Sequence, residues 1–241
     1  MMIRPIIAGL LLSFLLLACQ PAEPEGTRSE TATIETTTTN AADSLLPVDF
    51  SLKKVFADSA KLGLKSQVVS VKFDHFFKEE KRYLAFPLDE VLDLHIPEGL
   101  NPAELAISFV CTDGYKPSMT LDNVRLKKAY VAYKDLDTPE GQSWPDSVVK
   151  KFNPYYLIWE EVPYGNNDFT WPYGLAEITI NHFKAEFAGA YPEDPAIAPA
   201  FMVFQKRCMK CHAINGVGGI MGPEMNYPKN ITEYWQYSIF N

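Results

Sequence analysis

The stretch Cys208-Met209-Lys210-Cys211-His212 constrains this chain most, because it places two thiols and an imidazole side by side. Two cysteines separated by two residues lie on one helical turn, so both thiols can reach a single flat cofactor and form thioether bonds to its two vinyl groups. The imidazole of His212 can then ligate an iron ion from one face. This spacing is the attachment signature of a c-type haem, and it makes Cys208, Cys211 and His212 the candidate haem-binding residues, with His212 as the metal ligand.

Two other uses of a Cys-x-x-Cys pair remain open. A structural zinc site needs four nitrogen or sulfur ligands, but the chain has no second cysteine pair, and its other histidines are scattered at positions 75, 95 and 182. A redox dithiol is expected beside a strand–helix–strand pattern, which the sequence lacks here. The lack of further zinc ligands and of a strand–helix–strand pattern therefore favours haem over zinc or dithiol chemistry.

The residues around the motif resemble class I c-type cytochromes. Phe204 stands four residues before Cys208, where that family carries an aromatic residue in its first helix. Residues 215–225, Asn-Gly-Val-Gly-Gly-Ile-Met-Gly-Pro-Glu-Met, resemble the family's glycine-rich loop, with Met225 where leucine is usual. The resemblance implies that the Pro223 carbonyl accepts a hydrogen bond from the ring of His212, which would fix the orientation of a metal ligand.

The same resemblance predicts a small α-helical cytochrome c domain over residues 190–241 that is truncated relative to the family. Residues 198–210 should form its first helix, and residues 231–240 have helical spacing. The family usually supplies a distal methionine further downstream. The methionines available here, at positions 202, 209, 221 and 225, are poorly placed for that role, so we expect a distal position that is open or filled by water or a stray side chain.

The first residues resemble a bacterial lipoprotein signal. Arg4 precedes an apolar run over residues 6–17 that is too short to span a bilayer, and Leu-Ala-Cys follows at residues 17–19. This predicts a signal peptide over residues 1–18, with lipidation of Cys19. Residues 19–47 are rich in threonine, proline and glutamate and should form a disordered tether. The protein would then be anchored by lipid on the periplasmic side of a bacterial envelope, and Gln20 after the cysteine favours the outer membrane.

Net charge and cysteine count exclude some functions. The formal net charge is −8 and there is no basic cluster, so nucleic acid is not an expected partner, whereas a redox partner protein is. Of the four cysteines, Cys111 is left without an assigned role, and no internal disulfide is expected. Free cysteine is often simply a small buried apolar residue.

The middle of the chain, residues 48–189, predicts a β-rich α+β domain. Residues 87–94 suit a short helix with proline in its first turn, and residues 121–128 a second helix. The segments that are rich in β-branched and aromatic residues predict strands over residues 68–73, 105–110, 129–133, 155–160 and 175–183.

The order of short motifs in this region resembles the sulfite-oxidase-type, oxidoreductase molybdopterin-binding domain. The motifs are residues 81–92, Cys111-Thr112-Asp113-Gly114-Tyr115, residues 129–133 and residues 156–159. Catalytic members bind molybdenum through a cysteine thiolate and hold the pterin with several basic residues. Here only Cys111 is available and basic residues are sparse, so we do not expect molybdopterin.

The sequence therefore favours an exported, lipid-anchored c-type cytochrome that carries single electrons through one covalent haem, with the middle domain as a docking module. The alternative is a molybdenum-plus-haem oxidoreductase in which the haem relays electrons. A haem-based gas or redox sensor is a third hypothesis.

Overall fold

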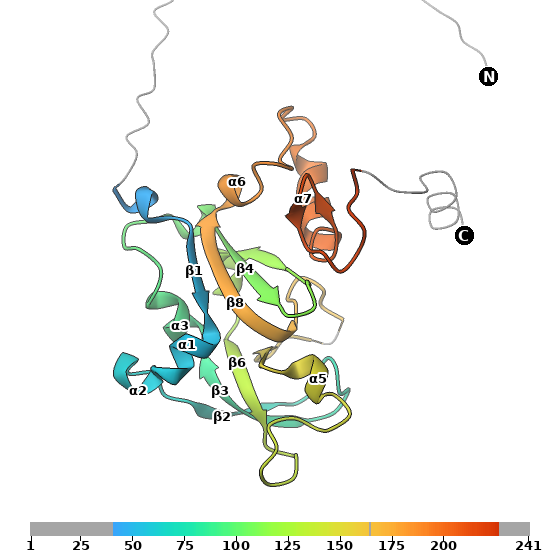
Figure 1. Ribbon diagram of the computed structural model, residues 1–241. Coiled ribbons are helices and arrows are strands. Elements are labelled where there is room, and N and C mark those ends of the chain that lie inside the picture. Colours follow the sequence, from blue (N-terminus) through green and yellow to red (C-terminus); the bar gives the residue numbers. More distant parts are fainter. Residues whose placement is uncertain (1–40, 164, 227–241) are drawn as a thin grey trace, which may run out of the picture. The chain divides into compact units, whose positions relative to one another are not determined.

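The computed structural model describes residues 41–163 and 165–226, and a large antiparallel sheet organises them (Figure 1). Its eight strands run in the order β2-β3-β6-β7-β8-β4-β5, with β1 paired to β8 beside this path. The strands are β1 (Val48–Ser51), β2 (Gln67–Val71), β3 (Lys81–Pro87), β4 (Leu105–Cys111), β5 (Ser118–Thr120), β6 (Ala129–Asp135), β7 (Tyr155–Trp159) and β8 (Tyr173–His182).

Short helices join these strands, so the fold is a β-rich α+β arrangement, as the sequence predicts. The helices are α1 (Leu52–Ala57), α2 (Ser59–Leu62), α3 (Leu88–Asp93), α4 (Leu121–Val124), α5 (Val149–Phe152), α6 (Phe183–Glu186) and α7 (Ala198–Arg207), and two 3-10 turns are η1 (Ala41–Leu45) and η2 (Pro102–Glu104). A small hairpin of β9 (Ala213–Ile214) and β10 (Val217–Gly218) follows α7. Among the described residues, no helix is long and apolar enough to cross a membrane.

Strand β8 holds the sheet together because it pairs with three other strands. One end pairs with β7, where Tyr155 stands opposite Leu175. The other end pairs with β1 on the same side as β7, through Val48 and Ile180. On the opposite side, β4 pairs with nearly the whole of β8, from Leu105 opposite His182 to Cys111 opposite Leu175. Figure 1 shows β8 (orange) running between β1 (blue) and β4 (green).

Side chains alternate between the two faces of the sheet, as a strand period of two requires. In β7, Leu157 and Trp159 point into an apolar core that α1, α3 and α4 cover. Tyr156 and Ile158 point the other way, into a largely aromatic core that includes Phe152 of α5. The two cores account for the nearly continuous burial of β7, which has no solvent-facing side.

A third apolar cluster lies on the second face of β4. Ala106 contributes from the strand, Phe187 from just after α6, and Phe201 and Met209 from α7 and the turn that follows it. We call residues 198–226 the haem-attachment segment, after its proposed role. Through this cluster the segment packs directly on the sheet.

Most predicted elements are present, with two corrections. The helix expected over residues 121–128 ends at Val124, because the chain must turn back into β6 at Ala129. The tether expected over residues 19–47 is too long at its end: residues 41–45 form η1, and Asp43 lies 3.0 Å from Nε2 of His182. The signal peptide, Cys19 and the helix expected over residues 231–240 lie outside the described residues. The domain boundary at 189/190 stays a prediction.

Candidate functional site

Helix α7 carries the candidate site at its C-terminal end. Pro199 stands in its first turn, where its missing N–H costs no hydrogen bond, and the basic side chains of Lys206 and Arg207 stand in the last turn. Phe201 and Gln205 are buried one turn apart and face the sheet. This face fixes how the helix lies, and therefore where its C-terminal end points.

The Cys-x-x-Cys-His stretch continues the helix by one further turn. The N–H groups of Cys211 and His212 donate to the Cys208 carbonyl over 3.1 and 2.9 Å. Both cysteines and His212 are half-buried, whereas Met209 between them is buried in the cluster on β4. The turn therefore anchors itself through Met209 and leaves the thiols and the imidazole accessible.

The two thiols lie close enough to affect each other. Burial raises the pKa of the Cys211 thiol, the charges of Asp113 and Cys208 raise it further, and Lys210 lowers it. Both cysteines are free thiols. Two neighbouring free thiols that are partly exposed suit thioether formation with one cofactor.

The ring of His212 is held by the carbonyl of Pro223, as the resemblance to cytochromes implies. The distance from Nδ1 to the carbonyl oxygen is 2.8 Å. A carbonyl oxygen can only accept, so Nδ1 carries the proton and donates. In the neutral imidazole Nε2 is then the unprotonated nitrogen, which is the form that binds a metal ion.

Three glycines bring the following loop against the turn. A Cβ atom on Gly222 would lie 2.6 Å from Nδ1 and 2.9 Å from Nε2 of His212. A Cβ on Gly218 would lie 3.0 Å from the Met209 carbonyl oxygen, and one on Gly219 would lie 2.7 Å from the Lys210 carbonyl carbon. No side chain fits at these positions, so the glycines serve close backbone packing rather than flexibility.

The loop also contains a hairpin that the sequence prediction missed. Asn215 and Gly216 have φ values of 51° and 75° and form the two-residue turn between β9 and β10. Asn-Gly is the strongest short hairpin signal, so the pattern could have been recognised. The Gly216 N–H donates to the Glu224 carboxylate over 2.9 Å, which closes the loop near Pro223.

The site also contacts the sheet through the turn that follows β4. The N–H of Lys116 donates to the Lys210 carbonyl over 2.8 Å, and the N–H of Ile220 donates to the Gly114 carbonyl over 2.9 Å. A Cβ on Gly114 would lie 2.5 Å from Cγ1 of Ile220. We call residues 208–212 the haem-attachment turn. The Asp113-Gly114-Tyr115 turn, which resembles a molybdopterin-binding motif, thus lies against this turn and the loop that follows it.

Cys111 ends β4 next to this contact. Its side chain is buried, at 5% exposure, and burial and the charge of Asp113 raise the pKa of its thiol. Tyr115 lies close to both Cys111 and Cys211, whose charges add to the effect of burial in raising the pKa of its phenol. Burial and a raised pKa both disfavour the thiolate form that metals bind.

A cleft of about 520 Å³ runs along another side of α7. Residues of α7 and of the turn after it line one wall of the cleft: Met202, Val203, Gln205, Lys206, Arg207 and Lys210. Cys208, Cys211 and His212 do not line it, but Lys210 does, so the cleft borders the Cys-x-x-Cys-His turn without including its thiols or its imidazole. Asp168 also lines the cleft and pairs with Lys206 at 2.8 Å.

The residues present fit a covalent haem. The accessible thiols of Cys208 and Cys211 would hold it, and Nε2 of His212 would ligate its iron. In the described part of the chain, no group of three or more His, Cys, Asp or Glu side chains could hold a metal ion.

Comparisons with protein-family models, curated protein sequences and solved structures find no match to this chain.

Proposed function

We propose that this chain is a c-type cytochrome that carries single electrons between redox partner proteins. The observation that carries the proposal is the geometry of His212, whose Nδ1–H donates to Pro223 beside two accessible thiols. This bond leaves Nε2 ready to bind iron and holds the ring in one orientation. A bound haem would supply a reversible one-electron iron couple.

The chain's own residues then have three tasks. Cys208 and Cys211 retain the cofactor, and Pro223 orients His212. The glycine-rich loop, residues 215–225, shields one face of the His212 imidazole from water. The sheet supports the turn through the backbone bonds of Lys116 and Gly114. The resemblance to class I cytochromes over residues 204–225, and to the sulfite-oxidase-type domain before it, supports this division of tasks.

Covalent attachment is the decisive test. The full chain, produced in cells that attach haem c, should retain haem through a denaturing gel and acid-acetone extraction. The double variant Cys208→Ser, Cys211→Ser should lose it, whereas Cys111→Ser should keep it. Release of haem from the wild-type protein would show that the c-type proposal is wrong.

The alternative enzyme, with molybdenum and haem together, is supported only by position. Cys111 and Cys211 both lie near Tyr115, so a metal on Cys111 would stand beside the haem. Its burial and raised pKa argue against a thiolate ligand there. We predict iron alone in metal analysis of the purified protein. Stoichiometric molybdenum that disappears in Cys111→Ser would establish the enzyme instead.

We further propose that the protein is exported and anchored through lipid on Cys19, on the periplasmic side of a bacterial envelope and in its outer membrane. The lipoprotein-like sequence at residues 1–19 supports this, as does the need for haem c attachment outside the cytoplasm. Cys19→Ala should release the protein from membranes with an unchanged absorbance spectrum. A variant that stays with the membrane fraction would rule out a lipid on Cys19 as the anchor.

A further inference from the structure

A carboxylate is buried beneath the haem-attachment turn. Glu186, the last residue of α6, has only 7% of its side chain exposed, and its Oε1 lies 2.8 Å from Nζ of Lys116. Ser108 of β4 donates its hydroxyl to the same oxygen over 2.8 Å, and the Asn181 amide donates to Oε2 over 3.5 Å. The charge of Glu186 is therefore paired and hydrogen-bonded, which is what permits its burial.

The network continues from the sheet into α7. Ser108 has one hydroxyl proton, which goes to Glu186, so the hydroxyl of Ser118 must donate to Ser108 over 2.6 Å. The Ser118 carbonyl in turn accepts from the buried amide of Gln205 over 3.3 Å. The polar side chains between the sheet and the haem-attachment segment thus form one connected set.

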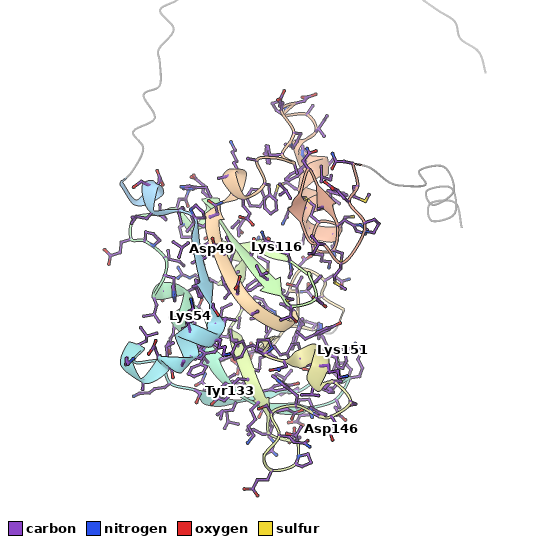
Figure 2. The ribbon with its side chains drawn as sticks, viewed as in Figure 1. Asp49, Lys54, Lys116, Tyr133, Asp146 and Lys151 are labelled. Carbon is purple, nitrogen blue, oxygen red and sulfur yellow. The ribbon has the colours of Figure 1, made fainter. Side chains whose placement is uncertain are left out.

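This set lies against the backbone that carries the haem ligands. Lys116 and Glu186 line a void of about 10 Å³ together with Met209 and Gly218, a volume at the lower limit for one water molecule. The N–H of Lys116 also bonds the Lys210 carbonyl. Figure 2 shows Lys116 on the side of the sheet from which the haem-attachment segment rises.

We propose that the Lys116–Glu186 ion pair positions the haem-attachment turn on the sheet and sets the reduction potential of the iron held by His212. The proposal rests on the proposed cytochrome function. Its reason is that a charge in a poorly solvated interior acts more strongly on nearby charges than the same charge in water, and the Glu186 side chain is 7% exposed and that of Lys116 30% exposed. The sheet then contributes to the redox site instead of serving as a separate module.

The sign of each charge gives the test. Oxidised iron carries one more positive charge than reduced iron, so the carboxylate of Glu186 favours the oxidised state. Glu186→Gln keeps the shape and the acceptor oxygen but removes the charge, and should raise the reduction potential. Lys116→Met removes the cation and should lower the potential. The double variant should return toward the wild-type value.

The measurement is a spectroelectrochemical titration of the haem-loaded full chain. The matched control is the exposed ion pair of Lys128 and Glu160, which joins the ends of β6 and β7 at 3.7 Å. Lys128→Met and Glu160→Gln remove the same charges from a pair whose side chains are 77% and 38% exposed, so solvent screening should make their shifts in potential much smaller. If Lys116→Met does not fold, Lys116→Gln provides the same test of sign.

A purely structural role would loosen the turn in both single variants and shift the potential in the same direction. Shifts of the reduction potential in the same direction, or shifts no larger than those of the control pair, would overturn the proposal. The proposed cytochrome function would still be supported if haem stayed covalently bound on a denaturing gel. A second measurement needs no haem: in the Cys208→Ser, Cys211→Ser background, Glu186→Gln should lower the thermal midpoint more than Glu160→Gln does. An equal effect would overturn the positioning role.

Discussion

The core of the sheet and the haem-attachment segment hold their shapes by different means. In the sheet, large side chains such as Phe109, Leu157 and Trp159 are fully or almost fully buried, and apolar burial supplies the stability. In the segment, Gly218, Gly219 and Gly222 allow backbone to lie on backbone and on the His212 ring. The first region should respond to lost volume and the second to added volume.

The largest expected effect is on the sheet. Leu157→Ala should lower the free energy of unfolding by about 2–5 kcal/mol, because it leaves a cavity between strand and helices. Urea titration of the haem-free chain measures this. Leu126→Ala, at a side chain that is 66% exposed, is the matched control and should change little. Equal losses would mean that Leu157 is not part of a tightly packed core.

Added volume in the segment should matter next. In Gly222→Ala the new methyl group meets the His212 ring, so we expect reduced haem loading, an altered haem absorption spectrum and a cost of about 1–3 kcal/mol. Gly216→Ala is the control, because Gly216 has φ +75° but nothing within 4 Å of a Cβ, so only backbone strain is added. A larger spectral change at residue 216 would contradict the packing argument.

The boundary between the two regions gives a finer comparison. Gly114 and Gly141 both have φ +87°, but only Gly114 has a neighbour, Ile220, in the path of a Cβ. The Ile220 side chain is 75% exposed and can rotate away. Gly114→Ala should therefore cost only about 1 kcal/mol more than Gly141→Ala, the energy of a displaced rotamer, as measured by thermal unfolding. No difference would mean that this contact does not join the regions.

The smallest effect concerns pH and the edge of the sheet. Burial alone would raise the pKa of Asp137, but hydrogen bonds from the side chain and backbone of Arg82, with the charges of Arg82 and Lys81, lower it below 3.8. The stabilisation is present above that ordinary value and is lost as pH falls through the lowered pKa. Arg82→Gln should therefore lower the stability slightly near neutral pH and make acid unfolding less steep below pH 4, where the stabilities of the variant and the wild-type protein converge. If the acid-unfolding curve of Arg82→Gln matched that of the wild-type protein, the Arg82–Asp137 pair would contribute nothing to stability.

The sequence predicted the strands whose apolar content is high. Residues 105–110, 129–133 and 155–160 match β4, β6 and β7 because strands that are covered on both faces consist of nearly continuous apolar residues. The charged start of β3 and the short, half-buried β5 gave no such signal. Helix α4 was predicted too long, since the position of its end depends on the return of the chain to β6.

At the site, the sequence predicted what lies within one short stretch. Cys208, Cys211, His212 and the bond to Pro223 follow from local spacing and resemblance. The contacts of Lys116 with Lys210 and with Glu186 could not be predicted, because these residues are far apart in the chain and meet only when the sheet forms. The polarity of Ser108 in an otherwise apolar strand was the one visible sign of a network there.

The position of β8 in the chain has a consequence for assembly. Every pairing in the large sheet involves residues between Val48 and His182, before α6 and α7 begin. If the chain is exported from its N-terminus, as proposed above, it can complete the sheet while the Cys-x-x-Cys-His stretch is still crossing the membrane. The thiols would stay open to the haem-attaching machinery until residues 198–226 settle on a surface that already exists. In that order, the haem-attachment segment packs on the sheet after the sheet has formed, and its thiols are accessible before it packs.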